Sequence, residues 1–307
     1  MPIKIPNDLP ASKILKEENI FVMDETRALS QRIRPLKLII VNIMPTKIVT
    51  ETQLLRLLSN TPLQIEVDWL CMESHNSKNT PQEHLMEFYK TFDEIKDNKY
   101  DGLIVTGAPV EKLKFEDVDY WDELTKIFDW ANTNVFSSFF ICWASQASLY
   151  YYYGVEKYQL KEKLTGVYHH HTNPEKMRRR ILRGFDYQFY APHSRYTSVK
   201  KEDIEKINSL DILASSNDAG VYLVAEKDGS RFFVTGHPEY DVMSLHYEYV
   251  RDVKRGLNPD IPKNYYKDDD PTKKPVKSWR CHANAMYYNW LNYYVYQVTP
   301  YDLEKDK

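Results

Sequence analysis

One stretch of the chain decides the fold, and it reads Phe139-Phe140-Ile141-Cys142-Trp143-Ala144-Ser145-Gln146. It closes an apolar run, residues 135–141, which is typical of a buried β-strand. Small residues follow Cys142, and a segment rich in Leu and Tyr then favours a helix. A strand that turns directly into a helix holds its turn residue at the carboxyl edge of the sheet, near the positive end of the helix dipole. Because that position favours a thiolate, the stretch predicts a nucleophile elbow with cysteine at its tip.

Strand and helix patterns alternate before this stretch. Strands are predicted at 36–44, 64–72 and 100–107, and helices at 50–58, 84–95 and 118–130. Apolar strands that alternate with helices indicate a doubly wound, mostly parallel α/β sheet flanked by helices. Ligands in such folds bind beyond the carboxyl ends of the strands, where both Cys142 and the loop 107–111 fall.

The second half of the chain predicts shorter elements and a distinctive tail. Its expected elements are strands at 164–168 and 185–190, a hairpin at 221–226 and 231–235, a helix at 242–254 and an extended loop at 257–278. The segment 289–296 is too aromatic to remain in water. We therefore expect a single domain over residues 1–307, with an N-terminal arm at 1–35. A C-terminal extension at 257–307 would pack on the body or on a dimer partner.

Composition narrows the function classes. The 307 residues are 42% hydrophobic, and 41 basic against 44 acidic residues give a net charge of -3, which argues against a nucleic-acid partner. Cys71, Cys142 and Cys281 are too far apart for a disulfide framework, so a cytoplasmic location is expected. We expect no membrane span and no secretion signal. The run 169–171 holds three histidines without an acidic pair, so no metal site is expected.

His237 and Glu239 flank Pro238 at the end of a predicted strand. Proline forces its predecessor into an extended conformation, in which residues two apart project to the same side. The glutamate can then bind one ring nitrogen and leave the other to deprotonate Cys142. Separately, each residue has a simpler interpretation: an inert buried cysteine, a capping histidine and a surface glutamate. Together they favour a nucleophile, a base and an orienting carboxylate.

These residues resemble a known family. Cys142 with Gln146 four residues later, and His237 with Glu239, look like the class I glutamine amidotransferase fold, a flavodoxin-like three-layer architecture. Nearly the whole chain resembles, more specifically, the homoserine O-acyltransferases of methionine biosynthesis. The matching stretches follow one another along the chain at 42–47, 106–111, 118–121, 141–143, 191–195, 236–240, 249–252 and 289–297.

The resemblance implies a two-step, ping-pong acyl transfer. Cys142 attacks the thioester of an acyl-coenzyme A and becomes an acyl-thioester. His237 takes the proton from the thiol and later from the hydroxyl of L-homoserine, while Glu239 orients His237. The backbone amides of Trp143 and Val110 would stabilise the tetrahedral oxyanion, and losing one such donor typically costs on the order of 10²–10³ in rate.

The resemblance also implies where the substrates bind. The family's amino-acid site maps onto Lys163, Ser194 and Arg251, and the Arg251 guanidinium would hold the homoserine carboxylate. In the family, glutamate at the position of Glu111 accompanies acetyl donors and glycine accompanies succinyl donors. Glu111 would repel the distal carboxylate of a succinyl group, so acetyl-CoA is the expected co-substrate. The family also implies a homodimer and no bound cofactor.

Three alternatives remain open from the sequence: succinyl transfer to homoserine, a glutamine amidotransferase, and a non-enzymatic binding module on the same fold. The chain also departs from the family at the elbow. Ala144, Ser145 and Ser148 stand where the family has glycine, alanine and glycine. If the turn needs a positive φ at residue 144, Ala144 would strain it by roughly 1 kcal/mol.

Overall fold

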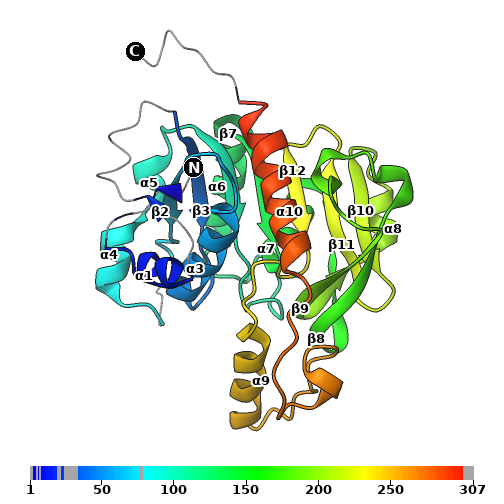
Figure 1. Ribbon diagram of the computed structural model, residues 1–307. Helices are drawn as coiled ribbons and strands as arrows, with labels where there is room; N and C mark the ends of the chain where they lie inside the picture. Colours follow the sequence, from blue (N-terminus) through cyan, green and yellow to red (C-terminus); the bar gives the residue numbers. More distant parts are fainter. Residues whose placement is uncertain are drawn as a thin grey trace.

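The computed structural model describes residues 3–4, 6, 8–18, 22–23, 34–75 and 79–299 (Figure 1). The strands are β1 (Ile3–Lys4), β2 (Val22–Met23), β3 (Leu36–Val41), β4 (Ile65–Leu70), β5 (Tyr89–Lys90), β6 (Tyr100–Val105), β7 (Val135–Ile141), β8 (Lys157–Thr172), β9 (Gln188–Val199), β10 (Leu210–Ser216), β11 (Gly220–Glu226) and β12 (Arg231–Val234). The α-helices are α1 (Pro10–Glu17), α3 (Lys47–Leu58), α4 (Gln82–Phe88), α5 (Phe92–Ile95), α6 (Trp121–Asn134), α7 (Trp143–Tyr153), α8 (Lys201–Glu205), α9 (Ser244–Lys254) and α10 (Arg280–Trp290). A π-helix, η4 (Leu291–Tyr296), continues α10, and short 3-10 turns lie at η1 (Pro174–Lys176), η2 (Arg180–Leu182) and η3 (Lys267–Asp269).

The strands form a single sheet in the order β2-β1-β4-β3-β6-β7-β12-β11-β10-β8-β9, with β5 attached to β4. From β2 to β12 in that order every neighbouring pair is parallel, and from β12 to β9 every pair is antiparallel. The parallel strands are apolar along most of their length because helices cover both faces of this part of the sheet. The predicted fold class, a mostly parallel α/β sheet flanked by helices, is confirmed.

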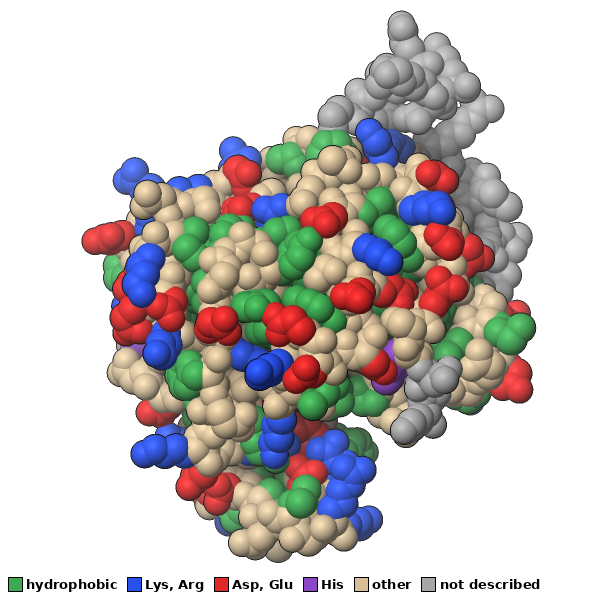
Figure 2. Space-filling model, turned by 180° about the vertical axis from the view of Figure 1, so that it is seen from behind, with side chains coloured by type: hydrophobic (Ala, Val, Ile, Leu, Met, Phe, Trp, Pro, Cys, Tyr) green, Lys and Arg blue, Asp and Glu red, His purple; other side chains and the backbone are tan. Residues whose placement is uncertain are grey.

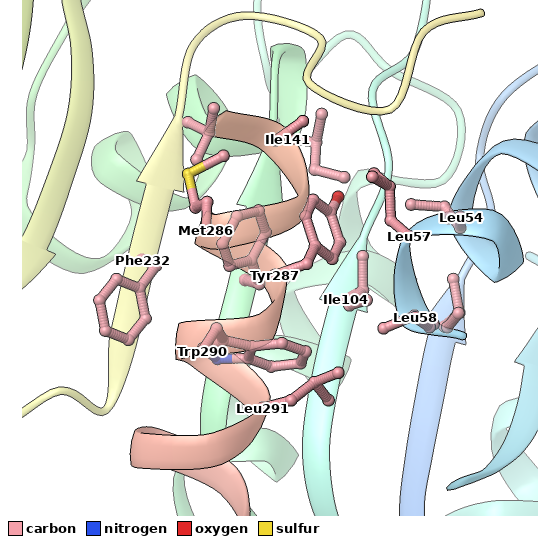
Figure 3. Close-up of a cluster of buried hydrophobic side chains, with 14 of the residues drawn as sticks. Leu54, Leu57, Leu58, Ile104, Ile141, Phe232, Met286, Tyr287, Trp290 and Leu291 are labelled. Carbon is pink, nitrogen blue, oxygen red and sulfur yellow. The ribbon is translucent and has the colours of Figure 1, made fainter. Parts of the chain in front are cut away.

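Two hydrophobic cores lie on the two faces of the sheet. One is formed with α1, α3 and α10, and the other with α6 and α7. The aromatic tail belongs to the first core: Trp290 and Leu291 are completely buried, as Figure 3 shows against Ile104 and Leu58. The Trp290 indole N–H also donates to Ser137 Oγ at 2.9 Å. The tail therefore packs on the body of its own chain, and its aromatic character gives no support to a dimer.

The sequence pattern misjudged two regions. The helix expected at 84–95 is interrupted, because Tyr89 and Lys90 pair with β4 and a capping box at Thr91 starts α5. The strand expected at 164–168 is part of the longer strand β8, whereas the strand expected at 185–190 begins only at Gln188, where β9 starts; β8 and β9 pair from Lys157 to His171. The first half of β8 is polar and largely exposed, so its sequence carried no apolar signal.

The expected N-terminal arm contributes to the body where the structure describes it. Strand β1 pairs in parallel with β4, and Leu15 of α1 is completely buried. Most of residues 19–35 lie outside the described part of the chain. Acidic and basic side chains intermingle on the face seen in Figure 2, in keeping with a net charge near zero. None of the helices among the described residues is long and apolar enough to cross a membrane.

Candidate active site

The elbow forms where the sequence predicts it. Cys142 follows β7 directly and is the N-cap of α7, with φ 51° and ψ -114°. A non-glycine residue in this conformation is strained and is typical of functional turns. The Cys142 amide donates to the carbonyl of Val234 at 2.7 Å, which ties the turn to the neighbouring strand. The side chain is 6% exposed.

The unusual residues after the cysteine support the turn. The positive φ lies at Cys142, whereas Ala144 is inside α7, so the strain considered at position 144 does not arise. The Ser145 hydroxyl donates to the Cys142 carbonyl at 2.6 Å, and the Ser148 hydroxyl donates to the Ala144 carbonyl at 2.7 Å. Ala144 and Ser145 are completely buried, and within a helix alanine is more favourable than glycine.

His237 reaches the same edge of the sheet because β12 is the parallel neighbour of β7, with Val234 opposite Ile141. Its Nδ1 lies 2.7 Å from Glu239 Oε1, and the two side chains are only 3% and 5% exposed. Burial opposes protonation of His237, but Cys142 and the Glu239 carboxylate outweigh burial and hold the pKa of His237 well above its usual value.

Gly107, after β6, closes the site on the other side. A Cβ at this position would lie 3.2 Å from Cys142 Cβ and 3.4 Å from His237 Cε1. The cysteine and the imidazole therefore converge on a backbone that lacks a side chain. The structure brings together the three residues that the sequence predicted as nucleophile, base and orienting carboxylate.

The two backbone amides expected to form an oxyanion hole are free to donate to a substrate oxygen. Within the described part of the chain, neither the Trp143 amide nor the Val110 amide donates a hydrogen bond to another residue. Trp143 is the first residue of α7, where amides have no partner inside the helix. Val110 lies in the same loop as Gly107, which contacts Cys142. These amides stay candidates for the oxyanion hole.

The three residues expected to bind the amino-acid substrate meet at α9. Lys163 Nζ lies 3.3 Å from Glu248 Oε2 and 3.0 Å from Asp252 Oδ2. The Ser194 hydroxyl donates to Glu248 Oε2. Arg251 pairs with Asp252 at 2.8 Å, and its side chain is 48% exposed. Lys163, Ser194 and Arg251 are thus joined by two carboxylates that the sequence analysis did not name.

Charge pairing sets the protonation of this cluster. Burial would lower the pKa of Lys163, but Glu248 and Asp252 outweigh it and raise that pKa. Burial would raise the pKa of Glu248, but Lys163, Ser194 and Tyr240 outweigh it and lower that pKa. Both groups are therefore charged at neutral pH.

Glu248 and Asp252 could have been found from their spacing. Residues four apart lie on one face of a helix, and a helix was expected over 242–254. Tyr240 was also missed as part of the site. Its ring stacks on His237 with centroids 4.1 Å apart and planes at 18°, and its hydroxyl donates to Glu248 Oε1 at 2.7 Å.

Glu111 lies half-buried in the loop after β6, where its carbonyl accepts a hydrogen bond from Lys157 Nζ at 2.8 Å. Its proposed influence on the acyl donor stays a prediction. Of the histidines at 169–171, His170 is completely buried and bonds to His193, with 3.1 Å between their Nε2 atoms. No group of three or more His, Cys, Asp or Glu side chains in the described ranges is placed to hold a metal ion.

Solved structures share this fold at low sequence identity. A glutamine amidotransferase from Thermotoga maritima matches with a TM-score of 0.57 at 12% identity, over 86% of this chain and 100% of its own. A glutamine amidotransferase from Methylobacillus flagellatus matches with a TM-score of 0.51 at 13% identity, over 84% of this chain and 94% of its own. At such identities the likeness shows the fold alone.

Sequence relatives are much closer. A homoserine O-acetyltransferase of Catenibacterium mitsuokai is 69% identical over 99% of this chain and 97% of its own length. A homoserine O-acetyltransferase of Acetivibrio thermocellus is 59% identical over the full length of both chains. The profile of the family described as homoserine O-succinyltransferase matches residues 2–301. The chain therefore belongs to the homoserine O-succinyltransferase family.

Proposed function

We propose that this protein is an L-homoserine O-acetyltransferase of methionine biosynthesis. The observation that carries the proposal is the strained elbow at Cys142, with His237 and Glu239 paired beside it at 2.7 Å. A buried cysteine with an adjacent base and an orienting carboxylate is suited to nucleophilic acyl transfer. Relatives that are 55–69% identical and span nearly the whole chain are homoserine O-acetyltransferases, and they support the same activity.

The first half-reaction transfers the acetyl group to the enzyme. Cys142 Sγ attacks the thioester carbon of acetyl-CoA while its proton passes to His237 Nε2, since Nδ1 is held by Glu239. The oxyanion that forms is stabilised by the amides of Trp143 and Val110. The tetrahedral intermediate then expels the CoA sulfur, which receives the proton from His237, and an acetyl-thioester remains on Cys142.

The second half-reaction transfers the acetyl group to homoserine. His237 Nε2 takes the proton of the homoserine hydroxyl as its oxygen attacks the acetyl-thioester. The new tetrahedral intermediate expels the Cys142 sulfur, which receives the proton from His237, and O-acetyl-L-homoserine leaves. No cofactor is needed, because acetyl-CoA is a co-substrate and both steps exchange only a proton and an acetyl group.

The cluster around α9 suits an amino acid. The half-exposed guanidinium of Arg251 can hold the α-carboxylate bidentately. Lys163 and Ser194 adjoin the same position through Glu248. The ammonium group of the substrate could replace Lys163 as the partner of the charged carboxylates of Glu248 and Asp252.

Names alone do not decide the acyl donor, because the family is described by succinyl transfer and the relatives are named for acetyl transfer. Glu111 supports the acetyl donor. Glu111 belongs to the loop that contacts Cys142 through Gly107, and its negative charge would repel the second carboxylate of a succinyl group.

Intact-mass spectrometry tests the proposal directly. The protein is incubated with acetyl-CoA or succinyl-CoA in the absence of homoserine, and the Cys142→Ala variant serves as the control. We expect one acetyl group on the wild type, none on the variant, and release of the label by L-homoserine. Succinyl labelling in place of acetyl labelling would contradict the role of Glu111. No label from either donor would contradict the mechanism.

We also propose that the protein is a single-domain homodimer in the cytoplasm. These expectations derive from the family and from the cysteine content, and the buried aromatic tail does not bear on the dimer. Sedimentation at working concentration tests the oligomeric state, and a monomer alone would contradict the dimer.

A further inference from the structure

We propose that Tyr240 is a positioning residue that links the catalytic His237 to the amino-acid site through Glu248. The inference rests on the proposed function, because it assigns Tyr240 a role in the step that uses homoserine. Tyr240 is three residues after His237 and is 6% exposed. None of its contacts is required to explain the pairing of His237 with Glu239.

The Tyr240 ring stacks on the face of the His237 imidazole. The two rings are nearly parallel, at 18°, with centroids 4.1 Å apart. Glu239 fixes only one edge of the imidazole, and stacking restricts the remaining rotation of the ring. The π-face also favours the imidazolium that forms in each half-reaction, since a cation over an aromatic face is stabilised electrostatically.

Tyr240 is in turn fixed by its hydroxyl and its carbonyl. The hydroxyl donates to Glu248 Oε1 at 2.7 Å, and the carbonyl accepts from the Trp279 indole N–H at 3.1 Å. Tyr240 and Trp279 belong to a small core that includes Leu245 of α9, together with Val167, Tyr265 and Tyr266. The ring that stacks on the histidine therefore cannot turn independently of α9.

Glu248 divides its oxygens between the two sites. Oε1 accepts from Tyr240, whereas Oε2 accepts from Ser194 and from Lys163 at 3.3 Å. An amino acid that displaces Lys163 from Oε2 would act on the same carboxylate that orients Tyr240. The geometry thus provides a path of four groups from the amino-acid site to the imidazole: substrate, Glu248, Tyr240 and His237.

The two contacts of Tyr240 can be removed separately. Tyr240→Phe keeps the stacked ring and loses the bond to Glu248, whereas Tyr240→Leu loses both. Tyr265→Phe is the matched control, because it removes a buried hydroxyl from the same core whose hydrogen bonds go to the Val242 carbonyl and the His246 amide, not to Glu248 or His237. Acetylation of Cys142 by acetyl-CoA reports the first half-reaction, and release of the acetyl group by homoserine reports the second.

We expect Cys142 of the Tyr240→Phe variant to be acetylated at a rate within about twofold of the wild type. Its kcat/KM for homoserine should fall about tenfold, as the loss of one hydrogen bond to a charged group predicts. Tyr240→Leu should slow acetylation about tenfold as well, because the ring contact is lost. Tyr265→Phe should match the wild type in both steps, and thermal melting confirms that each variant is folded.

Two results would overturn the inference: wild-type kinetics for homoserine in Tyr240→Phe, or an equal loss in Tyr265→Phe, which would make the effect one of core packing. Failure of acetyl-CoA to label the wild-type protein would instead overturn the proposed function itself, and the inference with it.

Discussion

Replacing Glu239 by glutamine tests the proposed mechanism at its most buried contact. The carboxylate lies 2.7 Å from His237 Nδ1, and both side chains are almost inaccessible to water. Burial alone would lower the pKa of His237, so Cys142 and Glu239 together must keep that pKa high. Glutamine keeps the size and one acceptor oxygen but removes the charge. The Glu239→Gln variant should therefore have a lower pKa at His237 and a weaker base beside Cys142.

The size of the effect follows from the distance. Unit charges with centres about 4 Å apart attract by about 4 kcal/mol at an effective dielectric constant of about 20. Desolvation of the carboxylate offsets part of this attraction. A net loss of about 2 to 3 kcal/mol corresponds to a decrease of about 30- to 150-fold in the rate of Cys142 acetylation. The decrease should be similar in both half-reactions, because His237 serves as the base in each.

The assay is single-turnover acetylation at neutral pH, followed by intact mass, with release by homoserine measured separately. Asp241→Asn is the matched control: it removes a carboxylate two residues farther along, where Asp241 pairs with Arg56 and not with His237. We expect the control to retain nearly full activity. A Glu239→Gln variant within about threefold of the wild type, or a control with an equal loss, would refute the role of the buried carboxylate.

Three further predictions concern packing and pH. Gly107→Ala adds a Cβ 3.2 Å from Cys142 Cβ, so the residues of the site must shift. The kcat should therefore fall about tenfold while the melting temperature stays unchanged. Full activity of this variant would contradict the contact. His170 is buried, which lowers its pKa to about 3, so the unfolded chain binds more protons below pH 6.5 and stability is lost as the pH falls. Between pH 7 and 5 this loss is about 2 kcal/mol in urea unfolding, and His170→Gln should remove it; equal slopes would contradict it. Trp290→Ala should lower the free energy of unfolding by about 3 to 5 kcal/mol, with Trp290→Phe as the milder control, and a change below about 1 kcal/mol would exclude a core role.

Local patterns were sufficient to predict that Cys142, His237 and Glu239 lie together at one edge of the sheet. The apolar run before Cys142 coincides with β7, and the spacing of His237 and Glu239 matches their observed contact. Both signals lie within a few residues of sequence, where periodicity and proline restriction act directly. The fold class followed from the same alternation of strands and helices.

Local patterns could not predict the contacts between segments that are distant in the sequence. Tyr240 and Glu248 are eight residues apart, but the hydrogen bond from Ser194 to Glu248 depends on how α9 packs against β9. The polar half of β8 is likewise a strand only because β9 pairs with it. Tertiary pairing determines such segments, and neither propensity nor periodicity predicts it.

The conformation of Cys142 shows why the position of the strain was misplaced. The family has glycine at residue 144, yet the residue with a positive φ is the cysteine itself. Val234 on β12 accepts the hydrogen bond from its amide, and the amide and hydroxyl of Ser145 bind its carbonyl. Hydrogen bonds to Val234 and from Ser145 thus fix both the amide and the carbonyl of the strained residue. Such a conformation persists when the surrounding structure holds it in this way. Ser145 therefore contributes a hydrogen bond to the turn that alanine could not supply, and the departure from the family pattern reinforces the elbow.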